Sequence, residues 1–160
     1  MTLTRPTYLH RHRVPLAAGP TAPAEARGQV RAAICTWDVP VDPGVAVLLT
    51  SELVTNAVRY ETGETVTLAI TSSCDQLRVD VYDTSRALPA PLDAPADAEA
   101  GRGLMMVDSL SAEWGYYRTP TGKAVYFTLD FQPDLYEGGD HGPQAAAPAL
   151  GSSRSNGAQR

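Results

Sequence analysis

Residues 42–60 read DPGVAVLLTSELVTNAVRY, and the rest of the chain can be interpreted outward from this stretch. Asp42 followed by Pro43 is typical of a helix start, because aspartate accepts hydrogen bonds at the N-cap and proline suits the first helical position. Apolar residues then recur at helical spacing from Val45 onward, and Gly63 marks the expected stop. The stretch therefore predicts one long amphipathic helix.

Two polar side chains sit within the apolar pattern of this helix. At about 100° per residue, Glu52 and Asn56 lie one turn apart on one face, beside Leu48 and Leu49. A carboxylate and a carboxamide bordered by apolar groups cost free energy unless they have partners. They are either hydrogen-bonded structural groups or part of a metal–phosphate site. In such a site the Asn56 oxygen suits Mg²⁺, and Glu52 can orient or deprotonate a hydroxyl.

The remaining periodicity predicts an α+β fold. Helical spacing recurs over residues 26–37 and 104–110, on either side of the long helix in the chain. Strands are predicted where apolar and polar residues alternate, at residues 66–71, 77–82, 114–117 and 125–131, and residues 8–16 are compatible with an edge strand. This order favours a two-layer α/β sandwich, with a mixed, mostly antiparallel sheet packed on about three helices.

Composition divides the 160 residues into one domain and two flanking segments. We expect a flexible N-terminus over residues 1–6 and a compact domain over residues 7–132. Residues 133–160 contain hardly any large apolar side chains, so we expect a disordered C-terminal tail. The irregular stretch 84–103 is long for a connection and is interpreted as a lid or as plain disorder.

Several classes of protein are disfavoured. A net charge of −5 argues against a nucleic-acid-binding protein, since such domains are usually basic. No apolar run is long enough for a membrane span, and the first residues lack a signal-peptide pattern. The 2 cysteines, Cys35 and Cys74, form neither a disulfide framework nor a metal-ligand spacing. We therefore expect a cytoplasmic protein with reduced thiols.

Two further features point to a ligand. Asp83 ends the apolar strand LRVDVYD, where an aspartate is either a turn former or an acceptor for an exocyclic amino group. Gly101-Arg102-Gly103-Leu104 stands immediately before the predicted short helix, where two glycines and a helix N-terminus can approach a phosphate. Neither a Rossmann fingerprint nor a P-loop is present, so any phosphate site lies outside both motifs.

Taken in order, the segments Glu52–Val58 (ELVTNAV), Asp83-Thr84-Ser85 and Gly101–Leu104 resemble the motifs of the GHKL (Bergerat-fold) ATPases. Within that superfamily the chain is similar to the small anti-sigma-factor serine kinases. The resemblance spans about residues 22–131. It implies the Bergerat fold, with residues 84–103 as the lid over ATP.

The resemblance also implies roles for individual residues. Asn56 resembles the asparagine that binds Mg²⁺ on the ATP phosphates, and Glu52 the proposed general base toward a protein serine. Asp83 resembles the aspartate that accepts a hydrogen bond from the adenine amino group. Gly101, Arg102, Gly103 and Leu104 resemble the phosphate end of the lid, and Arg59 stands where a polar residue commonly flanks the nucleotide.

Some positions depart from the family pattern. Ser85 and Ala87 replace two glycines that usually follow the adenine-binding aspartate, and Pro89 comes soon after them. Ala124 stands in a turn whose threonine hydroxyl often supports that aspartate. Tyr60 occupies a position that is often histidine in close relatives.

Together these observations predict an ATP–Mg²⁺-binding protein serine kinase. It would act as an anti-sigma factor or partner-switching regulator and phosphorylate a serine on an anti-anti-sigma-like protein. The expected partners are that protein and a sigma factor, with a homodimer possible and no direct contact with nucleic acid or membrane. The alternative is a nucleotide-binding module that sequesters a partner without phosphotransfer.

Overall fold

The computed structural model describes residues 8–86 and 99–133. The predicted flexible N-terminus, nearly all of the predicted tail and most of the predicted lid lie outside the described residues. Five strands and three helices are described. They are, in chain order, β1 (His10–Ala17), α1 (Ala22–Thr36), α2 (Pro43–Tyr60), β2 (Thr65–Ser72), β3 (Gln76–Asp83), α3 (Glu99–Leu110), β4 (Glu113–Thr119) and β5 (Gly122–Asp130).

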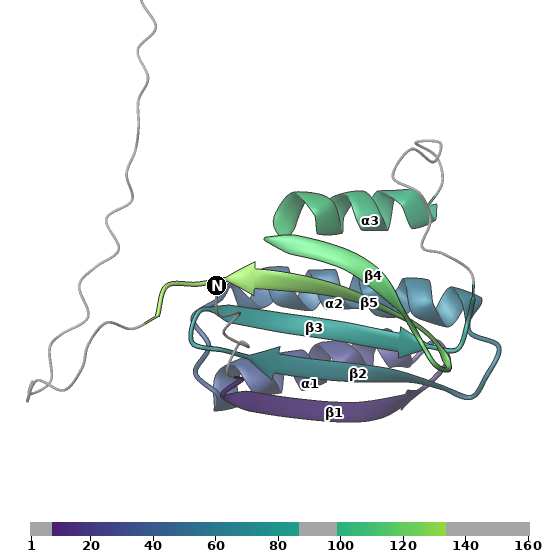
Figure 1. Ribbon diagram of the computed structural model, residues 1–160, viewed down its shortest axis with the longest axis horizontal. Helices are drawn as coiled ribbons and strands as arrows, with labels where there is room; N and C mark the ends of the chain where they lie inside the picture. Colours follow the sequence, from purple (N-terminus) through teal and green to yellow (C-terminus); the bar gives the residue numbers. More distant parts are fainter. Residues whose placement is uncertain (1–7, 87–98, 134–160) are drawn as a thin grey trace, which may run out of the picture.

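The strands form one sheet in the order β1-β2-β3-β5-β4, and every neighbouring pair is antiparallel. Helices α1 and α2 lie behind this sheet in Figure 1, and α3 lies beside α2 near the β4 edge. The predicted α+β two-layer sandwich is therefore confirmed, and the described sheet is wholly antiparallel. The N-terminal alternation forms a true edge strand, β1.

Helix α2 begins as its sequence predicts. The Asp42 carboxylate accepts hydrogen bonds from the N–H groups of Gly44 (2.8 Å) and Val45 (3.3 Å). Pro43 occupies the first helical position, where its missing N–H costs nothing. The cap fixes where the helix starts, and therefore which of its side chains face the sheet.

The core lies between the helices and one face of the sheet. Each large apolar side chain buried there contributes about 1.5–3 kcal/mol relative to exposure. The largest fully buried side chains of the strands are Leu68, Ile70, Leu77, Val79, Val81 and Phe127. Helix α2 buries Leu49, Leu53 and Val54 against them. These contacts determine which face of α2 points toward the sheet.

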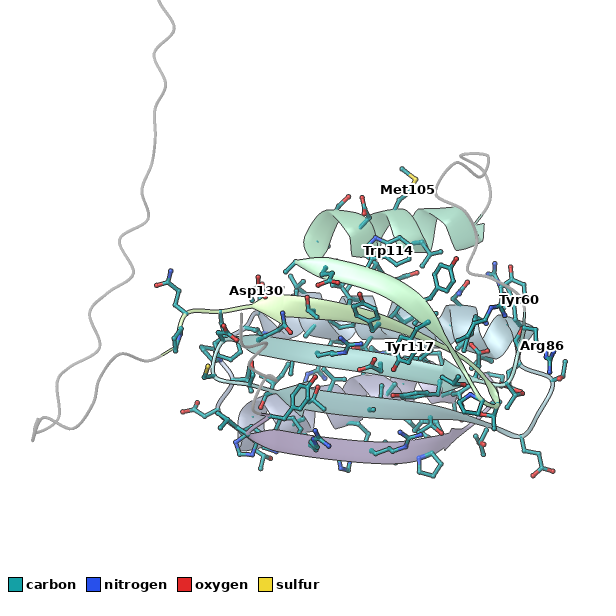
Figure 2. All side chains as sticks on the ribbon, viewed as in Figure 1. Tyr60, Arg86, Met105, Trp114, Tyr117 and Asp130 are labelled. Carbon is teal, nitrogen blue, oxygen red and sulfur yellow. The ribbon has the colours of Figure 1, made fainter. Side chains whose placement is uncertain are left out.

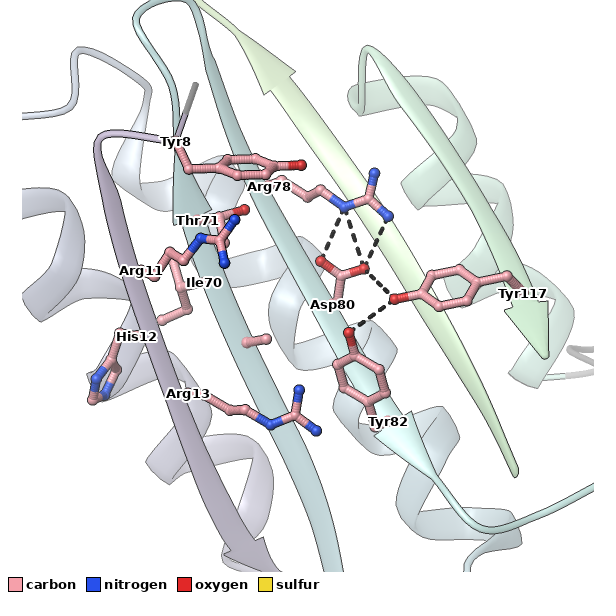
Figure 3. A pocket seen from close by; sticks show the side chains of 11 residues that line it. Tyr8, Arg11, His12, Arg13, Ile70, Thr71, Arg78, Asp80, Tyr82 and Tyr117 are labelled. Carbon is pink, nitrogen blue, oxygen red and sulfur yellow. Dashed lines mark hydrogen bonds and ion pairs between the residues drawn. The ribbon is translucent and has the colours of Figure 1, made fainter. Parts of the chain in front are cut away.

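The opposite face of the sheet carries charged and aromatic side chains (Figure 3). Arg78 forms an ion pair of 3.0 Å with Asp80, and the Tyr117 hydroxyl donates a 3.1 Å hydrogen bond to the same carboxylate. Burial raises the pKa of Tyr117, and its bond with Tyr82 adds to the rise. These groups satisfy one another and border a hollow of about 370 Å³.

Candidate nucleotide-binding site

Asn56 is the most unusual side chain of helix α2. It is only 7% exposed, and its Oδ1 has no hydrogen-bond partner within the described part of the chain. A buried polar atom without a partner costs about 1–3 kcal/mol, so its retention calls for an explanation. An amide oxygen is a hard ligand of the kind that Mg²⁺ prefers, and the orphaned atom therefore fits a bound magnesium ion.

Glu52 lies one turn before Asn56 and faces helix α3. A Cβ added at Gly103 would collide with the end of the Glu52 side chain, so a larger residue at this position would displace the Glu52 carboxylate. The structure thus brings together Glu52 and Gly103, which are far apart in sequence. Figure 2 shows α3 running along the β4 edge of the molecule, with Met105 on its outer side.

The predicted position of Gly101-Arg102-Gly103-Leu104 before a helix is wrong in one respect. Helix α3 begins at Glu99, so these four residues lie inside its first turns. Leu104 and Val107 are buried and hold the helix against the core, and glutamate and alanine at its start favour the extra turn. Gly101 and Gly103 therefore lie in helical backbone and not in a loop.

Asp83 ends strand β3 and is buried. Its Oδ1 accepts hydrogen bonds from the Lys123 ammonium and from the Ser85 N–H, both at 2.9 Å. Its Oδ2 is buried with no partner among the described residues. Burial raises the pKa of Asp83, and the Lys123 cation offsets part of that rise. One carboxylate oxygen is therefore fixed, while the other stays available as an acceptor.

Sequence analysis missed Lys123. Strand pairing places it directly opposite Asp83, whereas Ala124 lies opposite Tyr82. Since successive side chains of a strand alternate between faces, position 123 supports Asp83 and position 124 does not. The missing hydroxyl at Ala124 is therefore not a missing hydrogen-bond partner of Asp83. The available signal is that Lys123 is the sole lysine of the chain, although the sequence pattern predicts a turn there, ahead of the strand at residues 125–131.

Glu61 was also missed. Its carboxylate accepts hydrogen bonds from the Thr84 N–H (2.6 Å), the Thr84 hydroxyl and the Gly63 N–H (2.7 Å). Partial burial acts to raise the pKa of Glu61, but these hydrogen bonds outweigh it and lower the pKa. Glu61 thereby ties the end of α2 to the residue that follows Asp83.

The contact between Glu61 and Thr84 places Asn56 and Asp83 at the same end of the fold. Asn56 precedes Glu61 by five positions, which is about 7.5 Å along a helix. Asp83 precedes Thr84, which Glu61 holds. The two orphaned oxygens, Asn56 Oδ1 and Asp83 Oδ2, therefore belong to the same region, on the helix-covered side of the sheet. The hollow in Figure 3 lies on the opposite face and is a different feature.

Two further features of this region are the position of Arg59 and the side chains that could bind a metal. Arg59 is exposed on α2, and its role toward a nucleotide stays a prediction. Within residues 8–86 and 99–133, no three His, Cys, Asp or Glu side chains gather as a metal cluster. Asn56 Oδ1 is an oxygen of the kind that Mg²⁺ takes alongside water.

Comparison with known families gives a match over most of the described fold. The sequence model of the histidine kinase-like ATPase domain matches residues 16–129. A search of curated proteins gave no match. No helix among the described residues is long and apolar enough to cross a membrane.

Two solved structures are similar. The crystal structure of the RsbU and RsbW domains of Rv1364c from Mycobacterium tuberculosis is 19% identical, with a TM-score of 0.53, over 78% of this chain and 32% of that one. The histidine kinase domain of the blue-light activated histidine kinase EL346 from Erythrobacter litoralis is 25% identical, with a TM-score of 0.41, over 71% and 64%. The chain thus spans about a third of the first structure. The first likeness shows a shared fold.

Proposed function

The chain belongs to the histidine kinase-like ATPase domain family, of the GHKL type, and we propose that it is a protein serine kinase that uses Mg-ATP. Within that proposal, it acts as an anti-sigma factor in partner switching. The observation that carries the nucleotide site is the pair of buried oxygens without partners, Asn56 Oδ1 and Asp83 Oδ2. Each has the chemistry that one end of a nucleotide requires.

At the base, Asp83 Oδ2 accepts a hydrogen bond from the exocyclic amino group. At the phosphates, Asn56 Oδ1 would hold Mg²⁺, which would supply charge neutralisation at the phosphate oxygens. Glycines in the first described turn of α3 allow a phosphate to approach the backbone closely. Gly101 and Arg102 belong to that first turn, and Leu104 anchors it in the core.

Glu52 is the proposed general base. It takes the proton of the acceptor serine as the serine oxygen bonds to the γ-phosphorus and the bond to ADP breaks. Support comes from its place one turn from Asn56 and against Gly103, where α2 and α3 meet. Positioning and charge neutralisation carry most of the rate in such transfers, so one carboxylate is sufficient for the proton.

The proposed partners follow from the structural relative that contains an RsbW domain, together with the resemblance of the motifs. They are an anti-anti-sigma-like protein that carries the acceptor serine and a sigma factor. We propose a cytoplasmic protein, and a homodimer is compatible with this role.

A second candidate is a module that binds nucleotide and a partner without phosphotransfer. Ser85 and Ala87 favour it, because they replace two glycines that usually follow the adenine-binding aspartate in the family. Incubation with γ-labelled ATP and an anti-anti-sigma-like protein separates the two candidates. Labelled phosphoserine supports the kinase, and a stable complex without label supports the module.

Glu52→Gln tests the base directly. We expect ATP affinity within about twofold of wild type and a fall in phosphotransfer of about 100-fold or more. Glu25→Gln, an exposed substitution in α1, is the matched control and should change neither quantity. Equal loss of ATP binding and transfer in Glu52→Gln would reject its assignment as a base.

A further inference from the structure

The ion pair between Asp83 and Lys123 is almost completely buried. The side chain of Asp83 is fully buried and that of Lys123 is 3% exposed, at an Nζ–Oδ1 distance of 2.9 Å. Burying two charges is expensive, and a buried pair is weak evidence for stability by itself. Its placement at the proposed base-binding carboxylate indicates a role in the site.

Lys123 and the Ser85 N–H both act on the same oxygen, Oδ1 of Asp83. This leaves Oδ2 as a pure acceptor, buried and without a partner in the part of the chain that the structure describes. Because an ionised carboxylate has no proton to donate, it discriminates between a ligand group that donates and one that accepts.

We propose that Lys123 is a specificity-determining positioning residue, which holds Asp83 as an oriented carboxylate and so makes the site select 6-aminopurine over 6-oxopurine nucleotides. This inference rests on the proposed nucleotide site. Lys123 contacts Asp83, and Asp83 in turn contacts the base. A 6-amino group donates to Oδ2, whereas a 6-oxo group would place two acceptors against each other.

The charges around Asp83 explain why Lys123 is needed. Burial raises the pKa of Asp83, and the nearby Glu61 carboxylate at the end of α2 raises it further. Lys123 on β5 and the Ser85 N–H are the groups that oppose this rise. Without the cation, the pKa of Asp83 rises further, so a larger fraction of Asp83 carries a proton at a given pH. Its O–H can then donate to a 6-oxo group, so selectivity is relaxed.

The test measures the dissociation constants of Mg-ATP and Mg-ITP by calorimetry on the full chain, from pH 6.5 to 8.5. We expect wild type to prefer ATP by about tenfold or more across this range, in line with the cost of an unmatched buried acceptor. In Lys123→Met we expect the preference to fall below about threefold at pH 6.5 and to recover as the pH rises and Asp83 ionises.

Two variants serve as controls. Arg118→Met removes an exposed cation that lies opposite Lys123 on β4, and it should keep the preference of wild type. Lys123→Arg keeps a cation beside Asp83 and should retain most of the selectivity. It also provides a second reading if Lys123→Met does not fold.

Each outcome is decisive. If Lys123→Met weakens ATP and ITP equally at every pH, or changes neither, Lys123 has no role in specificity and the inference is wrong, while the proposed nucleotide site stands. Loss of selectivity in Lys123→Arg at every pH also overturns it. If wild type binds neither nucleotide, the proposed function and the inference fall together.

Discussion

Burial of Asn56 costs free energy, because no described residue donates a hydrogen bond to its Oδ1. Its Oδ1 is buried without a partner among the described residues, although the surrounding α2 residues pack well. Sequence spacing left two interpretations of this side chain open, a structural hydrogen bond or a metal ligand. The orphaned oxygen favours the second, because a structural amide would have an acceptor and a donor both satisfied.

Asn56→Leu separates these interpretations at the scale of the residue. Removing an unsatisfied buried amide and filling the space with apolar atoms should leave the free energy of unfolding within about 1 kcal/mol of wild type, as measured by urea denaturation. The same variant should abolish the difference in ATP affinity between Mg²⁺ and EDTA. A loss of several kcal/mol with Mg²⁺-dependent binding retained would restore the structural interpretation.

At the scale of elements, α2 and α3 meet through a glycine. Gly103→Ala improves helix propensity, but its Cβ meets the Glu52 carboxylate, which is the movable end of a flexible side chain. We expect stability to change by less than about 1 kcal/mol. We expect ATP binding to be retained and phosphotransfer to fall, because Glu52 is displaced.

Gly28→Ala is the matched control, since Gly28 lies in α1 with no atom within 4 Å of an added Cβ. It should stabilise the protein by up to about 1 kcal/mol and leave transfer unchanged. If Gly103→Ala transfers phosphate as fast as Gly28→Ala, the contact between α2 and α3 does not position the base.

The tie between α2 and β3 gives a dependence on pH. Because the pKa of Glu61 is lowered from its ordinary value of 4.5, its stabilising effect is present above that value and is lost as pH falls through the folded-state pKa. The urea midpoint of wild type should therefore fall more between pH 7 and pH 3 than the urea midpoint of Glu61→Gln. Glu64→Gln, which is exposed, should follow wild type. Identical curves for wild type and Glu61→Gln would show that the tie contributes nothing.

At the scale of the whole molecule, local signals predicted the elements, and long-range pairing determined the site. The Asp42–Pro43 cap and the apolar spacing of α2 are properties of a few neighbouring residues, so the sequence predicted them correctly. The Lys123–Asp83 and Glu61–Thr84 contacts join residues 40 and 23 positions apart, and no local pattern encodes them. The sequence pattern places the start of α3 too late, because Gly101 and Gly103 have low helix propensity although the helix includes them.

One end of this two-layer fold is the proposed binding site for Mg-ATP. The most direct measurement is a calorimetric titration of the full chain with ATP, once with Mg²⁺ and once with EDTA. We expect one binding site whose affinity falls when Mg²⁺ is removed, because Asn56 then has no ion to hold. Absence of binding under both conditions, or equal affinity in both, would contradict it.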